Sequence, residues 1–331
     1  MQTVTLIYGD GIGKEVIASA KAIVEASGAA VDWEVQEAGA EAAEKYGKPI
    51  DDAVLDSIAR NGVALKGHTA TPIGKGFRSV NVEIRKKLDL YVNLRPLRSF
   101  EGINSLYQNI DMTIVRENTE GLYIGIEKMV DEDHAEATKV ITRKASERIV
   151  KYAFDYAEKM GKKKVTAIHK ANIMKLTDGL FLNCAKEVAA KYPNIGFNDK
   201  IIDAACMDVT LNPYAYDVLV APNLYGDIIS DLCSALVGGL GVAPGANIGD
   251  NAAVFEAVHG SAPDIAGKDI ANPTSAILSS AMMLKHIGMT TEGKRIEDAV
   301  AACFAAGQMT GELGGKLGCK AFTDAVIANM K

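Results

Sequence analysis

Two aspartates stand four residues apart in the stretch "NLYGDIISDLCSALVGG", which has the apolar spacing of a helix. The carboxylates of Asp227 and Asp231 are therefore expected on one helix face, roughly 6 Å apart at Cβ. Like charges at this spacing destabilise a helix, and a divalent cation between them would reverse the effect. With oxygen ligands and no clustered Cys or His, that cation would be Mg²⁺ or Mn²⁺. Two solvated acids on an exposed face are the commoner explanation for such a pair taken by itself.

Three arginines occur among polar residues in "RSVNVEIRKKLDLYVNLRP" and "VRENTEGLY": Arg85, Arg95 and Arg116. A guanidinium binds a carboxylate through two parallel hydrogen bonds. Three of them near Ser79 and Asn81 indicate a substrate that carries several carboxylates. A solvated surface position explains each arginine separately, but Arg95 and Arg116 each end an otherwise apolar strand, where solvation is a weaker explanation.

Lys170 in "AIHKANIMK" and Tyr123 in "EGLYIGIE" form a candidate pair for proton transfer. The alternative for the lysine is an ordinary surface position at a strand end. The alternative for the tyrosine is a packed ring with a hydrated hydroxyl group.

The glycine-rich stretch "GDGIGKE" at 9–15 lies between an apolar strand and a helix, where phosphate-binding loops occur. A Walker loop has four residues between its first glycine and the Gly-Lys pair, and here only three intervene. The dinucleotide pattern G-x-G-x-x-G requires a glycine where Lys14 stands. The spacing therefore favours a glycine-permitted turn into the first helix.

Strands and helices alternate along the sequence, which predicts α/β architecture. Strands are expected at 4–8, 31–35, within 61–67, and at 111–116, 165–170, 200–203, 217–221 and 252–257. Helices are expected from residue 12 to before Gly28, and at 53–60, 145–160, 177–191, 225–237, 274–287, 292–307 and 320–330. The polar segment 128–143 predicts a projecting hairpin or arm, and the glycine-rich tract 237–250 predicts a crossing between domains.

Composition narrows the class of protein. A chain of 331 residues, 48% hydrophobic and 24% charged, indicates a globular protein of two domains. A net charge of −6 and a pI near 5.5 argue against nucleic-acid and anionic-membrane partners. Five scattered cysteines predict reduced thiols. An N-terminus that begins a strand within about four residues leaves no room for a targeting peptide, which predicts a cytoplasmic location, and an organellar chain after removal of its transit peptide is the alternative.

Taken together, these segments resemble the β-hydroxyacid oxidative decarboxylases, the family of isocitrate, 3-isopropylmalate, homoisocitrate and tartrate dehydrogenases. The resemblance covers essentially the whole chain, through "GDGIGKEV", "RPLRS", "RENTEGLYIGIE", "HKANIMK", "NLYGDIISDL", "GGLGVAPGANIG" and "FEAVHGSAPDIAGKDIANPTSAILSSAMML". It implies an α/β two-domain fold with a mixed sheet flanked by helices, which is not a Rossmann fold. The implied domains are a large cofactor-binding domain, 1–98 plus 249–331, and a small domain, 99–248, with the dimer interface and the arm.

The resemblance also implies roles for particular residues. Asp227 and Asp231 would bind Mg²⁺ or Mn²⁺ together with Asp203 of the second subunit. Tyr123 and the second subunit's Lys170 would be catalytic, within a homodimer with shared active sites or a higher oligomer built from it. A tricarboxylate substrate would be held by Ser79, Asn81, Arg85, Arg95 and Arg116. NAD would be held by Ile12, Thr71, Glu256, His259, Gly260, Ser261, Ala262, Asp264, Ile265 and Asn272.

Within the family, Ser79 and Asn81 favour isocitrate, because isopropylmalate dehydrogenases typically place an apolar side chain there. Homoisocitrate and 3-isopropylmalate are the alternative substrates. Asp264 and Ile265 stand where NADP-dependent relatives carry a Lys-Tyr pair, which favours NAD. A catalytically silent regulatory subunit is a further alternative, although the aspartates, Lys170 and Tyr123 are all present.

Overall fold

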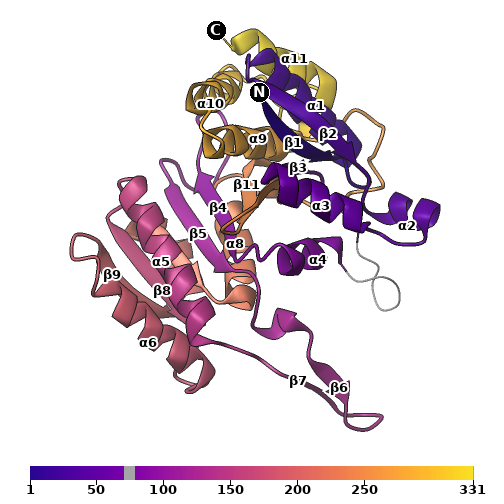
Figure 1. Cartoon of the computed structure of the whole chain (residues 1–331). Helices are drawn as coiled ribbons and strands as arrows, with labels where there is room; N and C mark the ends of the chain where they lie inside the picture. Colours follow the sequence, from indigo (N-terminus) through magenta and orange to yellow (C-terminus); the bar gives the residue numbers. More distant parts are fainter. Residues whose placement is uncertain (71–78, 331) are drawn as a thin grey trace. The chain divides into compact units, whose positions relative to one another are not determined.

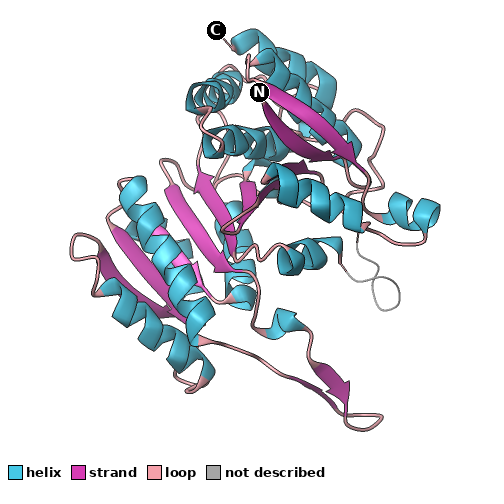
Figure 2. Ribbon diagram, in the orientation of Figure 1, coloured by secondary structure: helices cyan, strands magenta, loops and turns pink. Residues whose placement is uncertain are grey.

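The computed structural model describes residues 1–70 and 79–330, which fall into two units. Unit 1 comprises Met1–Leu90, Arg98–Asn109 and Val237–Lys331, and unit 2 comprises Tyr91–Leu97 and Ile110–Leu236. The predicted domains, 1–98 plus 249–331 and 99–248, differ from these units at 91–97, 99–109 and 237–248. Each unit is an α/β structure with its own run of strands (Figures 1 and 2).

Unit 1 contains a mixed five-strand arrangement in the order β2-β1-β3-β12-β11. Strand β1 pairs in parallel with β2 and β3, β3 pairs in parallel with β12, and β11 is antiparallel to β12. Because β3 is covered on both faces, all four of its residues are buried. The strands are β1 (Gln2–Ile7), β2 (Val31–Gln36), β3 (Val63–Lys66), β11 (Pro244–Ile248) and β12 (Ala253–Ala257).

Helices of unit 1 form because their apolar residues recur at helical spacing. In α1 (Gly13–Ala26), the buried residues include Val16, Ile17 and Ala20, and Gly28 follows the helix with a φ of +83°. Figure 1 shows α1 beside the C-terminal helices, with α3 across the strands from them. The other helices are α2 (Ala40–Tyr46), α3 (Asp52–Asn61), α4 (Val80–Lys87), α9 (Thr274–His286), α10 (Thr290–Ala305) and α11 (Cys319–Asn329).

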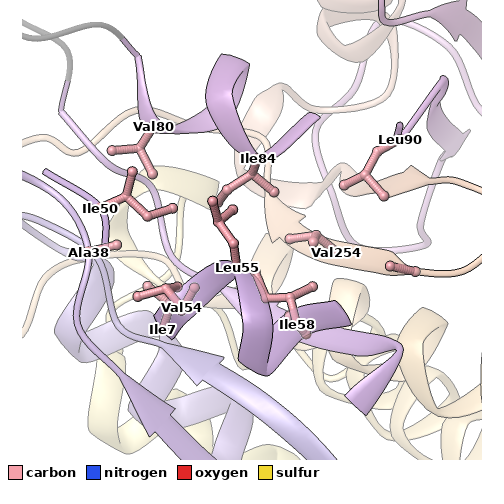
Figure 3. Packing of buried hydrophobic residues seen from close by; sticks show 12 residues of the cluster. Ile7, Ala38, Ile50, Val54, Leu55, Ile58, Val80, Ile84, Leu90 and Val254 are labelled. Carbon is pink, nitrogen blue, oxygen red and sulfur yellow. The ribbon is translucent and has the colours of Figure 1, made fainter. Parts of the chain in front are cut away.

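One part of the unit 1 core lies beneath α3 and α4. Figure 3 shows Leu55 and Ile58 of α3 gathered with Ile84 of α4 and Val254 of β12. Burying side chains of this size contributes about 1.5–3 kcal/mol each. The cluster therefore fixes α4, the helix that carries Arg85, against the strands.

Unit 2 has the strand order β4-β5-β10-β8-β9, in which β5, β10, β8 and β9 run parallel. These strands are β4 (Val92–Arg98), β5 (Asp111–Glu117), β8 (Lys164–His169), β9 (Gly196–Ile201) and β10 (Val218–Ala221). The helices are α5 (Arg143–Lys159), α6 (Thr177–Ala189), α7 (Ile202–Leu211) and α8 (Asn223–Leu236). Because carboxyl ends of parallel strands share one edge, Arg116, Lys170 and the start of α8 lie along the same edge.

The predicted arm is an exposed antiparallel hairpin, formed by β6 (Glu127–Met129) and β7 (Ala135–Ala137). It extends away from α5 and α6 of its own unit (Figure 1). Within the described ranges, no helix combines the length and apolar character needed to cross a membrane.

Two predicted elements need correction. The expected strand at 200–203 is wrong at its end, because β9 stops at Ile201 and Asp203 lies in the first turn of α7. The glycine-rich tract 237–250 is not simply a crossing, since it contains β11, which pairs with β12.

Candidate active site

Helix α8 presents Asp227 and Asp231 one turn apart, and each carboxylate is held by a buried arginine. Arg116 donates to Asp227, and Arg95 Nη1 donates to Asp231 Oδ1 at 2.7 Å. The arginine side chains are only 2% and 10% exposed, whereas the aspartate side chains are 32% and 54% exposed. The positive groups are thus fixed inside unit 2, and the carboxylates remain accessible.

Arg116 is fixed at the end of β5 by an amide and by a glycine. Its Nε and Nη2 donate to Asn223 Oδ1 at 3.0 and 2.7 Å. A Cβ added to Gly226 would lie 2.6 Å from Arg116 Cγ. Helix α8 can therefore lie against the arginine stem only with glycine at this position.

Tyr123 joins the same carboxylate from a 3₁₀ turn at Leu122–Ile124, where its hydroxyl donates to Asp227 Oδ2. The Arg116 guanidinium lies 5.3 Å from the centre of its ring. A cation–π contact of this kind attracts the guanidinium to the face of the tyrosine ring and so helps to hold the ring in place. Three predicted residues, Tyr123, Arg116 and Asp227, are thus brought together.

Lys170 directly follows β8, and its Nζ donates to Asp203 in the first turn of α7. This hydrogen bond holds the pKa of the Asp203 carboxyl below its ordinary value. Within the described part of one chain, no hydrogen bond or ion pair joins Lys170 or Asp203 to Asp227 or Asp231. The structure therefore forms two pairs in unit 2, one on α8 and one at the end of β8.

Glu256 lies in a buried charge cluster of unit 1. Its Oε2 lies 2.7 Å from Lys66 Nζ, its Oε1 lies 3.5 Å from Arg85 Nη2, and Asn247 Nδ2 donates to Oε1 at 2.7 Å. Burial alone would raise the pKa of Glu256, but the charges of Lys66 and Arg85 outweigh burial and lower it to about 2. The carboxylate, predicted as a cofactor contact, thus lies in an ion pair and is absent from the cavity described below.

The polar pair ahead of Arg85 begins α4. Ser79 Oγ accepts a long hydrogen bond of 3.5 Å from Val82 N–H as an N-cap, and Thr69 Oγ1 donates to Asn81 Oδ1 at 3.4 Å. The Nε of Arg85 is buried and makes no hydrogen bond within the described residues. The structure groups Arg85 with Glu256 in unit 1, and Arg95 with Arg116 in unit 2.

Unit 1 also contains a cavity of about 570 Å³, a size typical of ligand sites. Six of the predicted cofactor residues line it: Ile12, His259, Gly260, Ala262, Ile265 and Asn272. Ser261 and Asp264 belong to the same loop but do not line the cavity. Thr71 lies outside the described residues.

Other lining residues were not predicted as cofactor contacts. They are Gly241, Ile270, Gly311, Glu312, Lys316, Leu317 and Gly318. Most of them come from the tract "TGELGGKLG", whose glycine content marks a place of close backbone approach. That glycine content is the signal that could have identified this wall.

The stretch "GDGIGKE" supplies the cavity with Ile12 and is itself held by backbone contacts. Gly11 has a φ of +58°, and a Cβ there would lie 2.0 Å from the carbonyl oxygen of Ser261. Ile12 N–H donates to the same oxygen at 2.9 Å. The carboxylate of Asp10 accepts backbone N–H groups of Ala40 and Ala70, so it organises loops.

Comparison with known proteins identifies the class. The family model described as isocitrate/isopropylmalate dehydrogenase matches residues 3–326, so this chain belongs to that family of dehydrogenases. The predicted family and the predicted α/β fold with a mixed sheet flanked by helices are confirmed.

The individual relatives include both isocitrate dehydrogenases and 3-isopropylmalate dehydrogenases. The chain is 48% identical to the probable isocitrate dehydrogenase [NAD] subunit alpha, mitochondrial, of Drosophila melanogaster, covering 99% of this chain and 87% of that protein. It is also 48% identical to the 3-isopropylmalate dehydrogenase of Archaeoglobus fulgidus, covering 99% of both. The solved isocitrate dehydrogenase of Methylococcus capsulatus is 50% identical, with a TM-score of 0.97 over 100% of this chain and 99% of that one.

Proposed function

We propose that this chain is an NAD-dependent isocitrate dehydrogenase that converts isocitrate to 2-oxoglutarate and carbon dioxide. Overall identity does not select the substrate, because the isocitrate and isopropylmalate enzymes named above are equally similar. The observation that carries the proposal is the polar start of α4. Ser79 and Asn81 precede Arg85 there, and hydroxyl, amide and guanidinium groups suit a third carboxylate better than an isopropyl group.

The donor set on α8 fits a divalent metal ion. Asp227 and Asp231 offer accessible carboxylate oxygens one turn apart, and Mg²⁺ and Mn²⁺ prefer such ligands. We assign the ion to these two residues, together with Asp203 of a second subunit. When bound, it would polarise the hydroxyl and carboxylate oxygens of the substrate. Arg95 and Arg116, already buried, would orient the substrate carboxylates.

Two residues would move protons. Lys170 would accept the substrate hydroxyl proton as the hydrogen on the same carbon leaves as hydride. NAD in the unit 1 cavity would accept that hydride. After carbon dioxide departs, the hydroxyl of Tyr123 would protonate the carbon left behind, so the proton removed and the proton delivered balance.

We assign Lys170 and Asp203 to the active site of a second subunit, in a homodimer. Exposed apolar side chains surround both residues: Ile173 and Leu176 follow Lys170, and Met207 and Leu211 follow Asp203 on α7. Exposed apolar groups so close together are typical of a subunit interface. Co-refolding the inactive variants Lys170→Met and Tyr123→Phe should restore activity, because one site of the mixed dimer then holds both native residues. No recovery in verified mixed dimers would exclude sharing.

An assay panel tests the substrate. Isocitrate, homoisocitrate, 3-isopropylmalate and tartrate are each supplied with NAD or NADP and with Mg²⁺ or Mn²⁺. Isocitrate with NAD is expected to give the highest kcat/KM. A tenfold preference for another substrate, about 1.4 kcal/mol of transition-state binding, would replace it as the proposed substrate. No turnover of any substrate would favour the regulatory-subunit alternative.

A further inference from the structure

The proposed reaction leaves unused a buried carboxylate in unit 2, that of Asp178 in the first turn of α6. Its side chain is 0% exposed. Its Oδ1 accepts the ammonium group of Lys139, and its Oδ2 accepts the backbone N–H of Lys170 at 2.7 Å. Burying two charges is unfavourable unless their geometry compensates for the lost hydration. A pair placed directly on the backbone of Lys170 therefore suggests a role beyond stability.

The backbone around Lys170 is held at consecutive groups. Its N–H is bound by Asp178, and its carbonyl oxygen accepts the N–H of Met174 at 2.9 Å. The next N–H, that of Ala171, donates to His169 Nδ1 at 3.0 Å, while His169 Nε2 lies 2.9 Å from Asp199 Oδ2. With both sides of the peptide unit occupied, the position of the Lys170 Nζ varies only through its own side-chain rotamers.

Lys139 connects this anchor to two other parts of unit 2. Its Nζ lies 3.3 Å from Tyr225 Oη, 4.6 Å from the centre of that ring, and 3.5 Å from Met174 Sδ. Tyr225 precedes Asp227 by two residues on α8, and Lys139 follows the β6–β7 hairpin by two residues. One side chain thus contacts the segment after Lys170 and the helix of the acidic pair.

We propose that Asp178, with Lys139 as its counter-ion, is a positioning residue for Lys170. A carboxylate makes a stronger bond to the Lys170 N–H than a neutral acceptor would, and Lys139 supplies the opposite charge beside it in the interior. The pair fixes the backbone from which the Lys170 side chain extends and, through Lys139, connects it to the residues that follow the β6–β7 hairpin. This inference deepens the proposed function and depends on the assignment of Lys170 as catalytic.

The test compares two double variants that remove both charges and differ only in one acceptor. Asp178→Asn with Lys139→Met keeps an oxygen that can accept the Lys170 N–H, and Asp178→Ala with Lys139→Met removes it. The Asn variant should keep kcat within about tenfold of wild type. The Ala variant should lose a further 30-fold or so in kcat, with both KM values changed less than about threefold, since misplacement near 1 Å costs about 10²-fold. Equal kcat values in two folded variants would overturn the proposal.

A second readout does not depend on turnover. Acetylation of Lys170 by acetic anhydride, followed by mass spectrometry, reports the accessibility and nucleophilicity of its amine. Lys170 should react at a rate altered threefold or more in the Ala variant and close to wild type in the Asn variant, with exposed Lys294 as the internal control. Equal Lys170 rates in both variants would overturn the anchoring whatever the substrate. A wild type that does not turn over isocitrate would instead overturn the proposed function and leave this readout valid.

Discussion

Each unit contains a cluster of acidic and basic side chains, and the two clusters differ in which of these side chains are buried. In unit 1, Lys66, Glu256 and Arg85 have side chains that are all 15% exposed or less. In the unit 2 cluster around α8, the guanidinium groups of Arg95 and Arg116 are buried, and Asp227 and Asp231 reach solvent. The same residue types therefore serve different ends. A buried carboxylate in an ion pair stabilises the fold, whereas a solvent-accessible carboxylate can exchange its partner for a ligand.

The largest effect expected from this difference is on catalysis. Asp231→Asn preserves the shape of the side chain and removes the accessible charge, so kcat/KM for isocitrate should fall at least a thousandfold, about 4 kcal/mol. The free energy of unfolding, measured with urea, should change by about 1 kcal/mol or less, because the Asp231 side chain is exposed and Arg95 retains its hydrogen bond to Ser230. Calorimetric titration with Mn²⁺ should show weakened binding. Asp298→Asn, another exposed acid, is the control. A kcat/KM within tenfold of wild type would show that the exposed Asp231 carboxylate is not needed for catalysis.

A change in the buried cluster of unit 1 should mainly reduce the stability of the protein. Glu256→Gln leaves Lys66 buried without its counter-charge, so the free energy of unfolding should fall by about 3 kcal/mol or more. Urea denaturation provides the measurement. The matched control Glu25→Gln removes an exposed partner of Lys21 and should cost less than about 1 kcal/mol. Equal losses in the two variants would mean that burial of the charge does not matter.

Acid should remove the same stabilisation from the wild type. The pKa of Glu256 is lowered from 4.5 to about 2, so its contribution is complete above about pH 4.5 and is lost as pH falls toward 2. Between pH 6 and pH 3, the stability difference between wild type and Glu256→Gln should narrow by about 2 kcal/mol. A stability difference that stays constant over this range would show that the pKa of Glu256 is not lowered by folding.

The smallest effect is expected at Asp264, whose exposed side chain does not line the cavity. Asp264→Lys with Ile265→Tyr should shift the ratio of kcat/KM for NAD over NADP toward NADP by about tenfold, near 1.4 kcal/mol. Solvent screening at exposed Asp264 limits the repulsion of a 2′-phosphate. Wild type should prefer NAD. Unchanged discrimination in the double variant would assign cofactor choice to other residues, with Lys316 in the cavity wall as the next to change.

Local patterns in the sequence were sufficient for some of this structure. Asp227 and Asp231 occupy one helix because their neighbours have helical spacing, and α8 begins and ends within two residues of the prediction. Asp203 was expected on a strand because a short apolar run does not distinguish strand from helix. Strand β11 was missed because its sequence, "PGANI", contains Pro and Gly.

Other features depend on pairing between distant residues, which no local pattern encodes. Lys66 and Glu256 meet because they are register partners on the parallel strands β3 and β12. The register is set by which faces of the two strands are buried, and that requires the whole of unit 1. The family resemblance implies that Glu256 contacts the cofactor, and its ion pair with Lys66 is visible only in three dimensions.

The discontinuity of unit 1 also has a consequence for synthesis. Strand β3 precedes residues 110–236 of unit 2, while β12, its hydrogen-bonding neighbour, follows them. As the chain leaves the ribosome, unit 2 has its helices and parallel strands before unit 1 has its second half. Until β12 emerges, the buried edge of β3 is open to pairing with other chains. The first ninety residues therefore carry an unpaired strand edge for as long as residues 110–236 are being synthesised.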